Sequence, residues 1–218
     1  MFNIKFILFG ILVFLISLQS CTNEFESNGQ NVCFETDVLP VLVSNCTQSG
    51  CHNDIDKEAD LVINNYNEII GLVKVGDYRA SKLYQVLILP FGSARMPPSP
   101  YSSLTDEQIQ TIALWIEQGA LKDSCVTPSC DTTGVRFGSS IVPILNLYCN
   151  GCHSGANAQG AVRLDSYGEV KKYVNSGSFI GSIEWTGSFG RMPKNGSKLR
   201  SCEISKIKKW LSDGAPNN

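Results

Sequence analysis

The residues best suited to chemistry form one short motif, Cys149-Asn150-Gly151-Cys152-His153. Two cysteines separated by two residues, with a histidine directly after the second, are the attachment pattern of c-type haem. In that pattern both sulfurs bond to the porphyrin, and the histidine takes an axial position on the iron. The sequence therefore predicts covalent haem on Cys149 and Cys152, with His153 as an iron ligand.

Two other chemistries use closely spaced cysteines. A zinc site needs about four ligands, and the only other histidine of the chain, His52, belongs to a separate motif. A thioredoxin-like dithiol is expected within a βαβ unit, which the sequence does not suggest. Haem attachment is the interpretation that the motif favours.

A second motif has the same ending but a wider spacing. His52 directly follows Cys51, and four residues separate Cys51 from Cys46. The loop must bulge to bring both sulfurs to one haem, and Gly50 gives it conformational freedom. We predict a second haem on Cys46 and Cys51, with His52 on the iron. The alternative is a domain without haem, in which these two cysteines form a small disulfide.

The methionines supply the remaining iron ligands. Apart from Met1 there are only Met96 and Met192, each in an Arg-Met-Pro tripeptide downstream of one Cys-His pair. No histidine is left for a second nitrogen ligand, so we predict both methionines as axial ligands opposite the histidines, a ligation that raises the reduction potential. The alternative is that they fill the core. Arg95 and Arg191 either contact haem propionates or face solvent.

The second half of the chain repeats the first. Four blocks recur in the same order: 36–46 and 140–149, 61–72 and 162–174, 95–97 and 191–193, 109–120 and 204–215. A repeat of this length indicates a duplicated domain. We expect domains at 33–125 and 126–218.

Helices must position these residues. Apolar runs at 38–44 and 141–147 end at the haem-binding cysteines, although strand is an alternative for runs so short. The helical pattern is clearer in the segments after the Met-Pro loops. Thr105 and Gln108 form a capping box before an amphipathic stretch that stops at Gly119.

The same closing helix is expected in the second domain, where it ends at Gly214. Two further short helices are expected at 81–89 and 179–185. The fold class predicted for both domains is mainly α. A domain of about 90 residues has a marginal core of its own, so we expect folding to depend on the cofactor.

The N-terminus predicts export. Lys5 precedes an apolar run at 6–18 that is too short for a stable membrane span. The following Leu-Gln-Ser-Cys resembles a bacterial lipobox, which is cut before its cysteine, here Cys21. We expect a signal peptide at 1–20, a lipid on Cys21 and a polar tether at 21–32, which anchor the protein to a bacterial membrane on the periplasmic or cell-surface side. The alternative is a soluble secreted protein.

Four of the nine cysteines remain after lipid and haem are assigned: Cys33, Cys125, Cys130 and Cys202. Four thiols allow three pairings. We favour Cys33–Cys125 and Cys130–Cys202, which tie together the ends of each domain. The rival pairs Cys125 with Cys130 across the linker.

Charge divides the chain. Residues 33–125 contain twelve Asp and Glu against six Lys and Arg, whereas residues 130–218 contain six against eleven. The basic residues around the second Met-Pro loop are Arg191, Lys194, Lys198 and Arg200. They could steer an acidic redox partner; alternatively, the opposite charges pack the two domains together. Nucleic acid is not expected as a partner, given export and a net charge of −2.

Together these motifs resemble the c-type cytochrome domains of Bacteroidetes lipoproteins and of planctomycete-type cytochromes, over residues 33–218. The shared pattern is a Pro-Ile/Val-Leu run, a Cys-His site, a Met-Pro loop and a closing Trp helix with Gly-Ala. The resemblance implies two tandem class I-like cytochrome c domains. We expect a membrane-anchored electron carrier with two haems c that exchanges electrons with redox protein partners. The alternatives are a small peroxidase-like dihaem enzyme and a haemless interaction lipoprotein held by disulfides.

Overall fold

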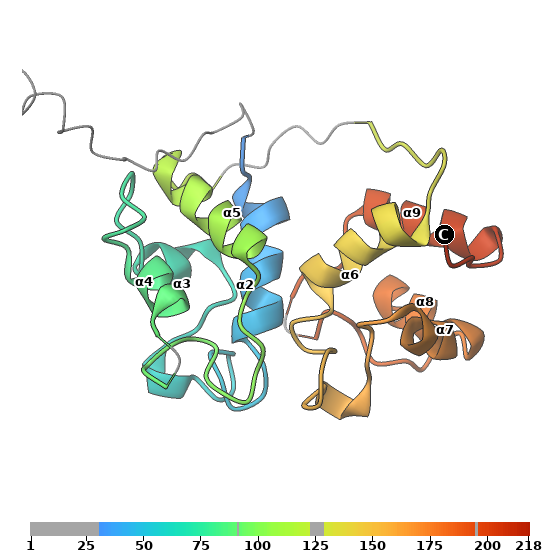
Figure 1. The fold of residues 1–218 in the computed structure, drawn as a ribbon, viewed down its shortest axis with the longest axis horizontal. Coiled ribbons are helices and arrows are strands. Elements are labelled where there is room, and N and C mark those ends of the chain that lie inside the picture. The colour runs from blue at the N-terminus through green and yellow to red at the C-terminus, as the bar shows by residue number, and fades with distance from the viewer. Residues whose placement is uncertain (1–30, 91, 123–128, 195) are drawn as a thin grey trace, which may run out of the picture. The chain divides into compact units, whose positions relative to one another are not determined.

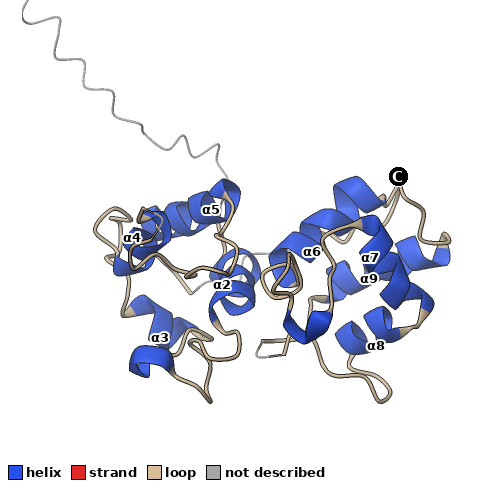
Figure 2. Cartoon of the chain, turned by 60° about the horizontal axis from the view of Figure 1, so that its bottom comes forward, coloured by secondary structure: helices blue, strands red, loops and turns tan. Residues whose placement is uncertain are grey.

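The computed structural model describes residues 31–90, 92–122, 129–194 and 196–218. These residues form helices joined by loops and no strand, so the predicted mainly α class is confirmed (Figure 2). The segment from Asn31 to Asn218 is one compact unit. The predicted signal peptide, Cys21 and nearly all of the tether lie outside the described residues. No helix within the described ranges is long and apolar enough to cross a membrane.

The first half of this unit contains six helical segments. They are the π-helical turn η1 (Phe34–Val38), α2 (Leu39–Cys46), the 3₁₀ turn η2 (Glu58–Asp60), α3 (Tyr66–Ile70), α4 (Lys82–Ile88) and α5 (Asp106–Glu117) (Figure 1). The second half repeats this order. Its segments are η3 (Phe137–Ile141), α6 (Val142–Tyr148), η4 (Gln159–Ala161), α7 (Tyr167–Asn175), α8 (Ser178–Glu184) and α9 (Ser201–Ser212).

The apolar runs before the haem motifs are helices, so the strand alternative is wrong. Each run is longer than its apolar pattern suggested, because η1 continues directly into α2 and η3 into α6. A proline lies in the first turn of both α2 and α6, directly after the π-helical turn that precedes each helix. The predicted capping box of Thr105 and Gln108 starts α5.

An aromatic cluster closes the first core. The ring of Trp115, which is buried in α5, lies 5.2 Å from that of Phe34 and 6.5 Å from that of Tyr66. The indole N–H donates to the carbonyl of Leu121 at 2.9 Å, and the hydroxyl of Tyr66 donates to that of Ala120 at 2.9 Å. These contacts connect both ends of the first half.

The second core repeats this cluster. Trp210 in α9 lies 5.5 Å from Phe137, and its N–H donates to the carbonyl of Pro216. Tyr167 donates to the carbonyl of Ala215. The two halves therefore have separate hydrophobic cores with the same construction.

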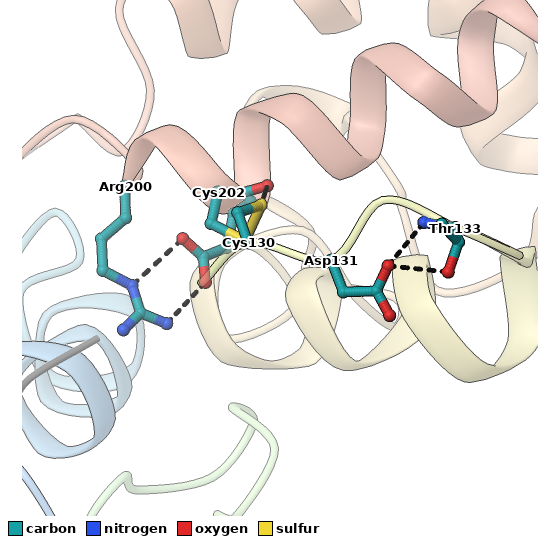
Figure 3. The surroundings of a disulfide bond; sticks show 6 residues. Cys130, Asp131, Thr133, Arg200 and Cys202 are labelled. Atoms are coloured by element: carbon teal, nitrogen blue, oxygen red, sulfur yellow. Dashed lines mark hydrogen bonds and ion pairs between the residues drawn. A yellow bond between two sulfur atoms is a disulfide. The ribbon is translucent and has the colours of Figure 1, made fainter. Parts of the chain in front are cut away.

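The Cys130–Cys202 disulfide joins the segment before η3 to the first turn of α9 (Figure 3). The favoured pairing is confirmed for these two cysteines, and the rival pair of Cys125 with Cys130 is wrong. Cys33 is also disulfide-bonded, to a partner outside the described residues. Its pairing with Cys125 therefore stays a prediction.

We expect the Cys130→Ser/Cys202→Ser double variant to lose about 4 kcal/mol of unfolding free energy, because the bond closes a loop of 72 residues in the unfolded chain. Urea denaturation of both proteins without reductant measures the difference. Equal midpoints and equal slopes would contradict this contribution.

Candidate functional site

The second Cys-His motif forms a tight turn at the end of α6. The backbone N–H groups of Cys152 and His153 both donate to the carbonyl oxygen of Cys149, at 3.1 and 2.9 Å. Helix α6 delivers Cys149 into this turn. The turn therefore gathers two sulfurs and one imidazole within five residues.

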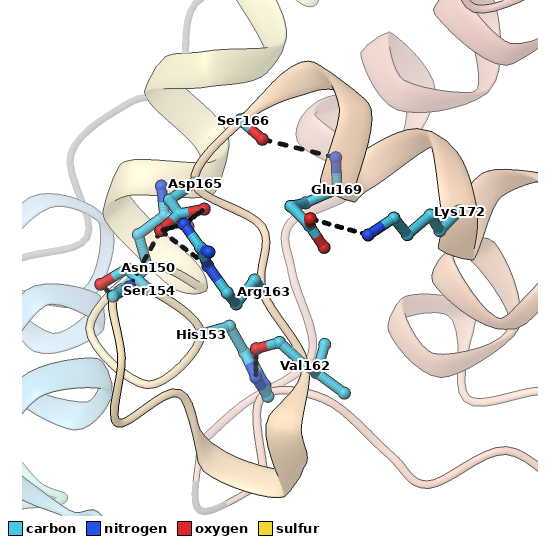
Figure 4. Close-up of polar contacts among 10 residues, drawn as sticks. Asn150, His153, Ser154, Val162, Arg163, Asp165, Ser166, Glu169 and Lys172 are labelled. Atoms are coloured by element: carbon cyan, nitrogen blue, oxygen red, sulfur yellow. Dashed lines mark hydrogen bonds and ion pairs between the residues drawn. The ribbon is translucent and has the colours of Figure 1, made fainter.

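The imidazole of His153 is oriented by a backbone carbonyl. Its Nδ1 lies 3.2 Å from the oxygen of Val162 (Figure 4), so the ring presents Nε2 as the remaining nitrogen. Burial lowers the pKa of His153, which favours the neutral ring at physiological pH. A neutral imidazole with its other nitrogen bonded to a carbonyl is the usual state of a metal-binding histidine.

A cavity of about 650 Å³ opens beside this turn, a volume typical of cofactor sites. Its lining contains all four residues predicted for the second haem: Cys149, Cys152, His153 and Met192. Apolar side chains form much of the remaining wall, among them Val162, Leu164, Phe179, Ile183 and Leu199. An apolar cavity with two thiols, an imidazole and a thioether fits a covalently attached haem.

Met192 is held by its backbone. Its N–H donates to the carbonyl of Ser182 at 3.1 Å, and its carbonyl accepts from the indole N–H of Trp185 at 2.8 Å. The guanidinium of Arg191 lies over the Trp185 ring at 5.4 Å and is exposed. Of the two alternatives for Arg191, the structure favours the solvent-facing one.

The first motif has the same local construction. The N–H of His52 donates to the carbonyl of Cys46 at 3.0 Å, and Nδ1 of His52 lies 2.9 Å from the carbonyl oxygen of Glu58. Met96 donates from its N–H to the carbonyl of Val86 in α4, as Met192 does to α8. Met96 does not belong to the lining of the 650 Å³ cavity.

Arg95 differs from Arg191. Its Nε atom is buried and has no hydrogen-bond partner among the described residues. Leaving a buried charged donor unpaired is costly, so this position calls for an acceptor. A carboxylate, such as a haem propionate, would satisfy it.

The four cysteines assigned to haem are free thiols, namely Cys46, Cys51, Cys149 and Cys152. Burial raises the pKa of Cys46 and of Cys149 to about 12 and that of Cys152 to about 11. This direction is opposite to the lowered thiol pKa that is typical of a redox dithiol. The small Cys46–Cys51 disulfide of the alternative interpretation does not form in this structure.

Polar side chains that the sequence motifs did not single out hold the wide loop of the first motif. Gly50 has a φ of 77°, and its N–H donates to Oδ2 of Asp56 at 2.7 Å. The same oxygen accepts from the side chain of Asn53. These two hydrogen bonds, Asn53's first, lower the pKa of Asp56, with a smaller contribution from Lys194. The only sign of this arrangement in the sequence is that Asn53 and Asp56 follow shortly after Cys51-His52.

The loop after His153 is held in a similar way. Asp165 accepts from the N–H of Gly155 at 2.9 Å and forms an ion pair with Arg163 at 3.0 Å (Figure 4). Both interactions, the Gly155 bond foremost, lower the pKa of Asp165. The Asp165 carboxylate thus connects the start of the loop after His153 to the segment after Val162.

Some of the basic residues around the second Met-Pro loop interact with carboxylates of the chain itself. Arg200 donates to both carboxylate oxygens of Glu203 (Figure 3), and Lys194 acts on Asp56 of the first domain. The alternative in which opposite charges face each other between the domains therefore has support from Lys194.

The described residues contain no group of three or more His, Cys, Asp or Glu that could hold a metal ion. A haem iron needs no such group, because the porphyrin supplies most of its ligands. No protein-family model, curated protein or solved structure matches the chain. What it binds must therefore be inferred from its own residues and their geometry.

We expect Asp165→Asn to lower the free energy of unfolding by about 1 kcal/mol at pH 7, because the charge that pairs with Arg163 is lost. The folded pKa of Asp165 lies below its unfolded value of about 3.9. Its stabilisation is therefore present above pH 4 and disappears as pH falls through the folded pKa. Chemical denaturation between pH 3 and 7, with the exposed Asp60→Asn as control, measures this; a difference that grows on acidification would contradict it.

Proposed function

We propose that this chain is a c-type cytochrome with two covalently bound haems, built from two tandem class I-like domains, and that it transfers electrons between redox partners. The observation that carries the proposal is the shared cavity wall of Cys149, Cys152, His153 and Met192. These residue types are the ones that attach a c-type haem and fill both axial positions of its iron.

When bound, haem supplies an iron that alternates between the ferric and ferrous states. Cys149 and Cys152 would attach the porphyrin, and His153 would offer its Nε2 to the iron. The hydrogen bond from Nδ1 of His153 to the carbonyl of Val162 fixes the ring and makes Nε2 a stronger donor. Met192, which lines the same cavity, would supply its thioether sulfur as a second protein ligand.

The first domain repeats these roles with Cys46 and Cys51 as attachment residues, and His52 and Met96 as iron ligands. Its histidine has the same carbonyl contact. Arg95 would pair its buried Nε with a haem propionate. Cys46, Cys51, His52 and Met96 do not line the 650 Å³ cavity, so the first haem is supported by the motif and by these contacts alone.

An electron carrier is favoured over a peroxidase-like enzyme by the way in which Met192 is held. An enzyme needs an open or displaceable axial position. The Met192 backbone is bonded on both sides, to Ser182 and Trp185, which opposes displacement of its side chain. The haemless alternative pairs Cys46 with Cys51 in a disulfide, whereas both are free thiols in this structure, which opposes it.

Export and lipid anchoring through Cys21 complete the proposal, because c-type haem attachment and the disulfides both belong to an exported protein. The partners are redox proteins at that membrane. Lys198 and Arg191 are exposed beside the second ligand loop and favour an acidic partner for this domain.

The test is to replace each proposed methionine ligand in the holoprotein. We expect Met192→Ala to lower one of the two midpoint potentials by on the order of 0.1 V, within the range of roughly 0.8 V that axial ligands span, and to allow cyanide binding at one haem. Met96→Ala should do the same at the other haem. Spectroelectrochemical titration and cyanide difference spectra measure both effects.

Glu117→Gln, at the exposed end of α5, serves as the control and should leave both potentials and cyanide binding unchanged. Wild-type protein that already binds cyanide at both haems would contradict the carrier assignment and favour an enzyme. Variants with unchanged potentials would contradict methionine ligation.

A further inference from the structure

The wider spacing of the first motif places a buried glutamine against the second motif. Gln48 lies between Cys46 and Cys51 and is only 4% exposed. Its Nε2 donates to the carbonyl oxygen of Gly151 at 2.5 Å, and its Oε1 accepts from Nε2 of Gln159 at 3.3 Å. Gly151 lies between the two haem-binding cysteines of the second domain. The loop of one motif thus binds the loop of the other.

The backbones of the two motifs also approach closely. A Cβ built at Gly151 would overlap the carbonyl group of Ser44 and come within 2.9 Å of Cγ of Asn45. The sulfur of Cys152 lies 3.1 Å from the carbonyl oxygen of Ser44. The attachment pattern leaves the residue type at position 151 open, so the glycine is required by the contact between domains.

The first domain also forms part of the wall of the second haem cavity. Its contributions to the lining include Val43, Thr47, Gln48, Asn53, Ile55 and Asp56. Ile55 is 88% exposed. Helices α2 and α6, which carry the two motifs, contact each other. The second cavity is therefore a composite of both domains.

We propose that the loop between Cys46 and Cys51 is a docking element, in which Gln48 is the positioning residue that holds the two attachment loops together and makes the two haems an electronically coupled pair. The coupling rests on the proposed function, whereas the docking concerns the chain alone. With both haems bound, such a pair would allow one electron to pass from a ferrous to a ferric iron, and no further reactant would be consumed.

This proposal accounts for the departure of the first motif from the usual spacing. If only two residues separated the cysteines, as in the second motif, the loop would be too short to bring Gln48 to Gly151. The left-handed φ of Gly50 and the bonds to Asp56 hold the longer loop in a defined shape. A loop that served haem attachment alone would need neither.

The experiment compares full-length holoproteins that carry Gln48→Ala or Gly151→Ala with two matched controls. Gly168→Ala adds the same methyl group in α7, where nothing lies within 4 Å of it. Gln85→Ala removes a glutamine whose side chain bonds within the first domain, to the carbonyl of Arg79. Haem content, circular dichroism in the Soret region and hydrogen exchange of residues 149–153 are measured on each.

We expect two haems per chain in all five proteins and an exciton couplet in the wild type and both controls. Gln48→Ala and Gly151→Ala should lose most of the couplet. Their amides at 149–153 should exchange on the order of tenfold faster, the effect of losing about one buried hydrogen bond. Unchanged melting of the far-ultraviolet signal shows that both variants fold.

A wild-type protein with two haems but no couplet, or docking variants that match the wild type in couplet and exchange, would overturn the docking proposal and leave the haem assignment standing. A wild type without haem would refute the proposed function. In that case the exchange measurement still decides whether Gln48 docks the two loops.

Discussion

The turn at the end of α6 is the constraint on which the second domain depends. Two sulfurs can reach one porphyrin only if their Cα atoms are held close together, with the histidine facing the same side. The carbonyl oxygen of Cys149 achieves this by accepting from both Cys152 and His153. The remaining elements place apolar walls and a methionine around that turn, and the closing helix α9 with Trp210 completes the core behind it.

Both halves of the compact unit share this construction, but they differ where they contact each other. The corresponding hydrogen bonds of His52 and His153, and of Met96 and Met192, are preserved. The first motif has gained a longer loop, and that loop contacts the second motif through Gln48. The repeated sites and the contact between them therefore lie on corresponding elements of the two halves.

Much of this architecture follows from local sequence signals. The capping box at Thr105 predicted α5 because its hydrogen bonds lie within one turn. The Cys149-His153 turn is local in the same way, which is why its motif could be recognised in the sequence. The docking of Gln48 could not be predicted, because its partner Gly151 is 103 residues away and a glutamine in a loop has no pattern that names its acceptor. The short helices α3 and α7 were also not predicted: their blocks repeat, but α3 has only five residues, too few for a clear periodicity.

The central claim is that both motifs bind haem covalently. The most direct measurement is a pyridine haemochrome assay on protein matured in a host competent for c-type haem attachment, after denaturation and removal of free haem, normalised to protein concentration. The account predicts two haems per chain. One haem would contradict the assignment of Cys46 and Cys51, and a colourless protein would contradict the account as a whole.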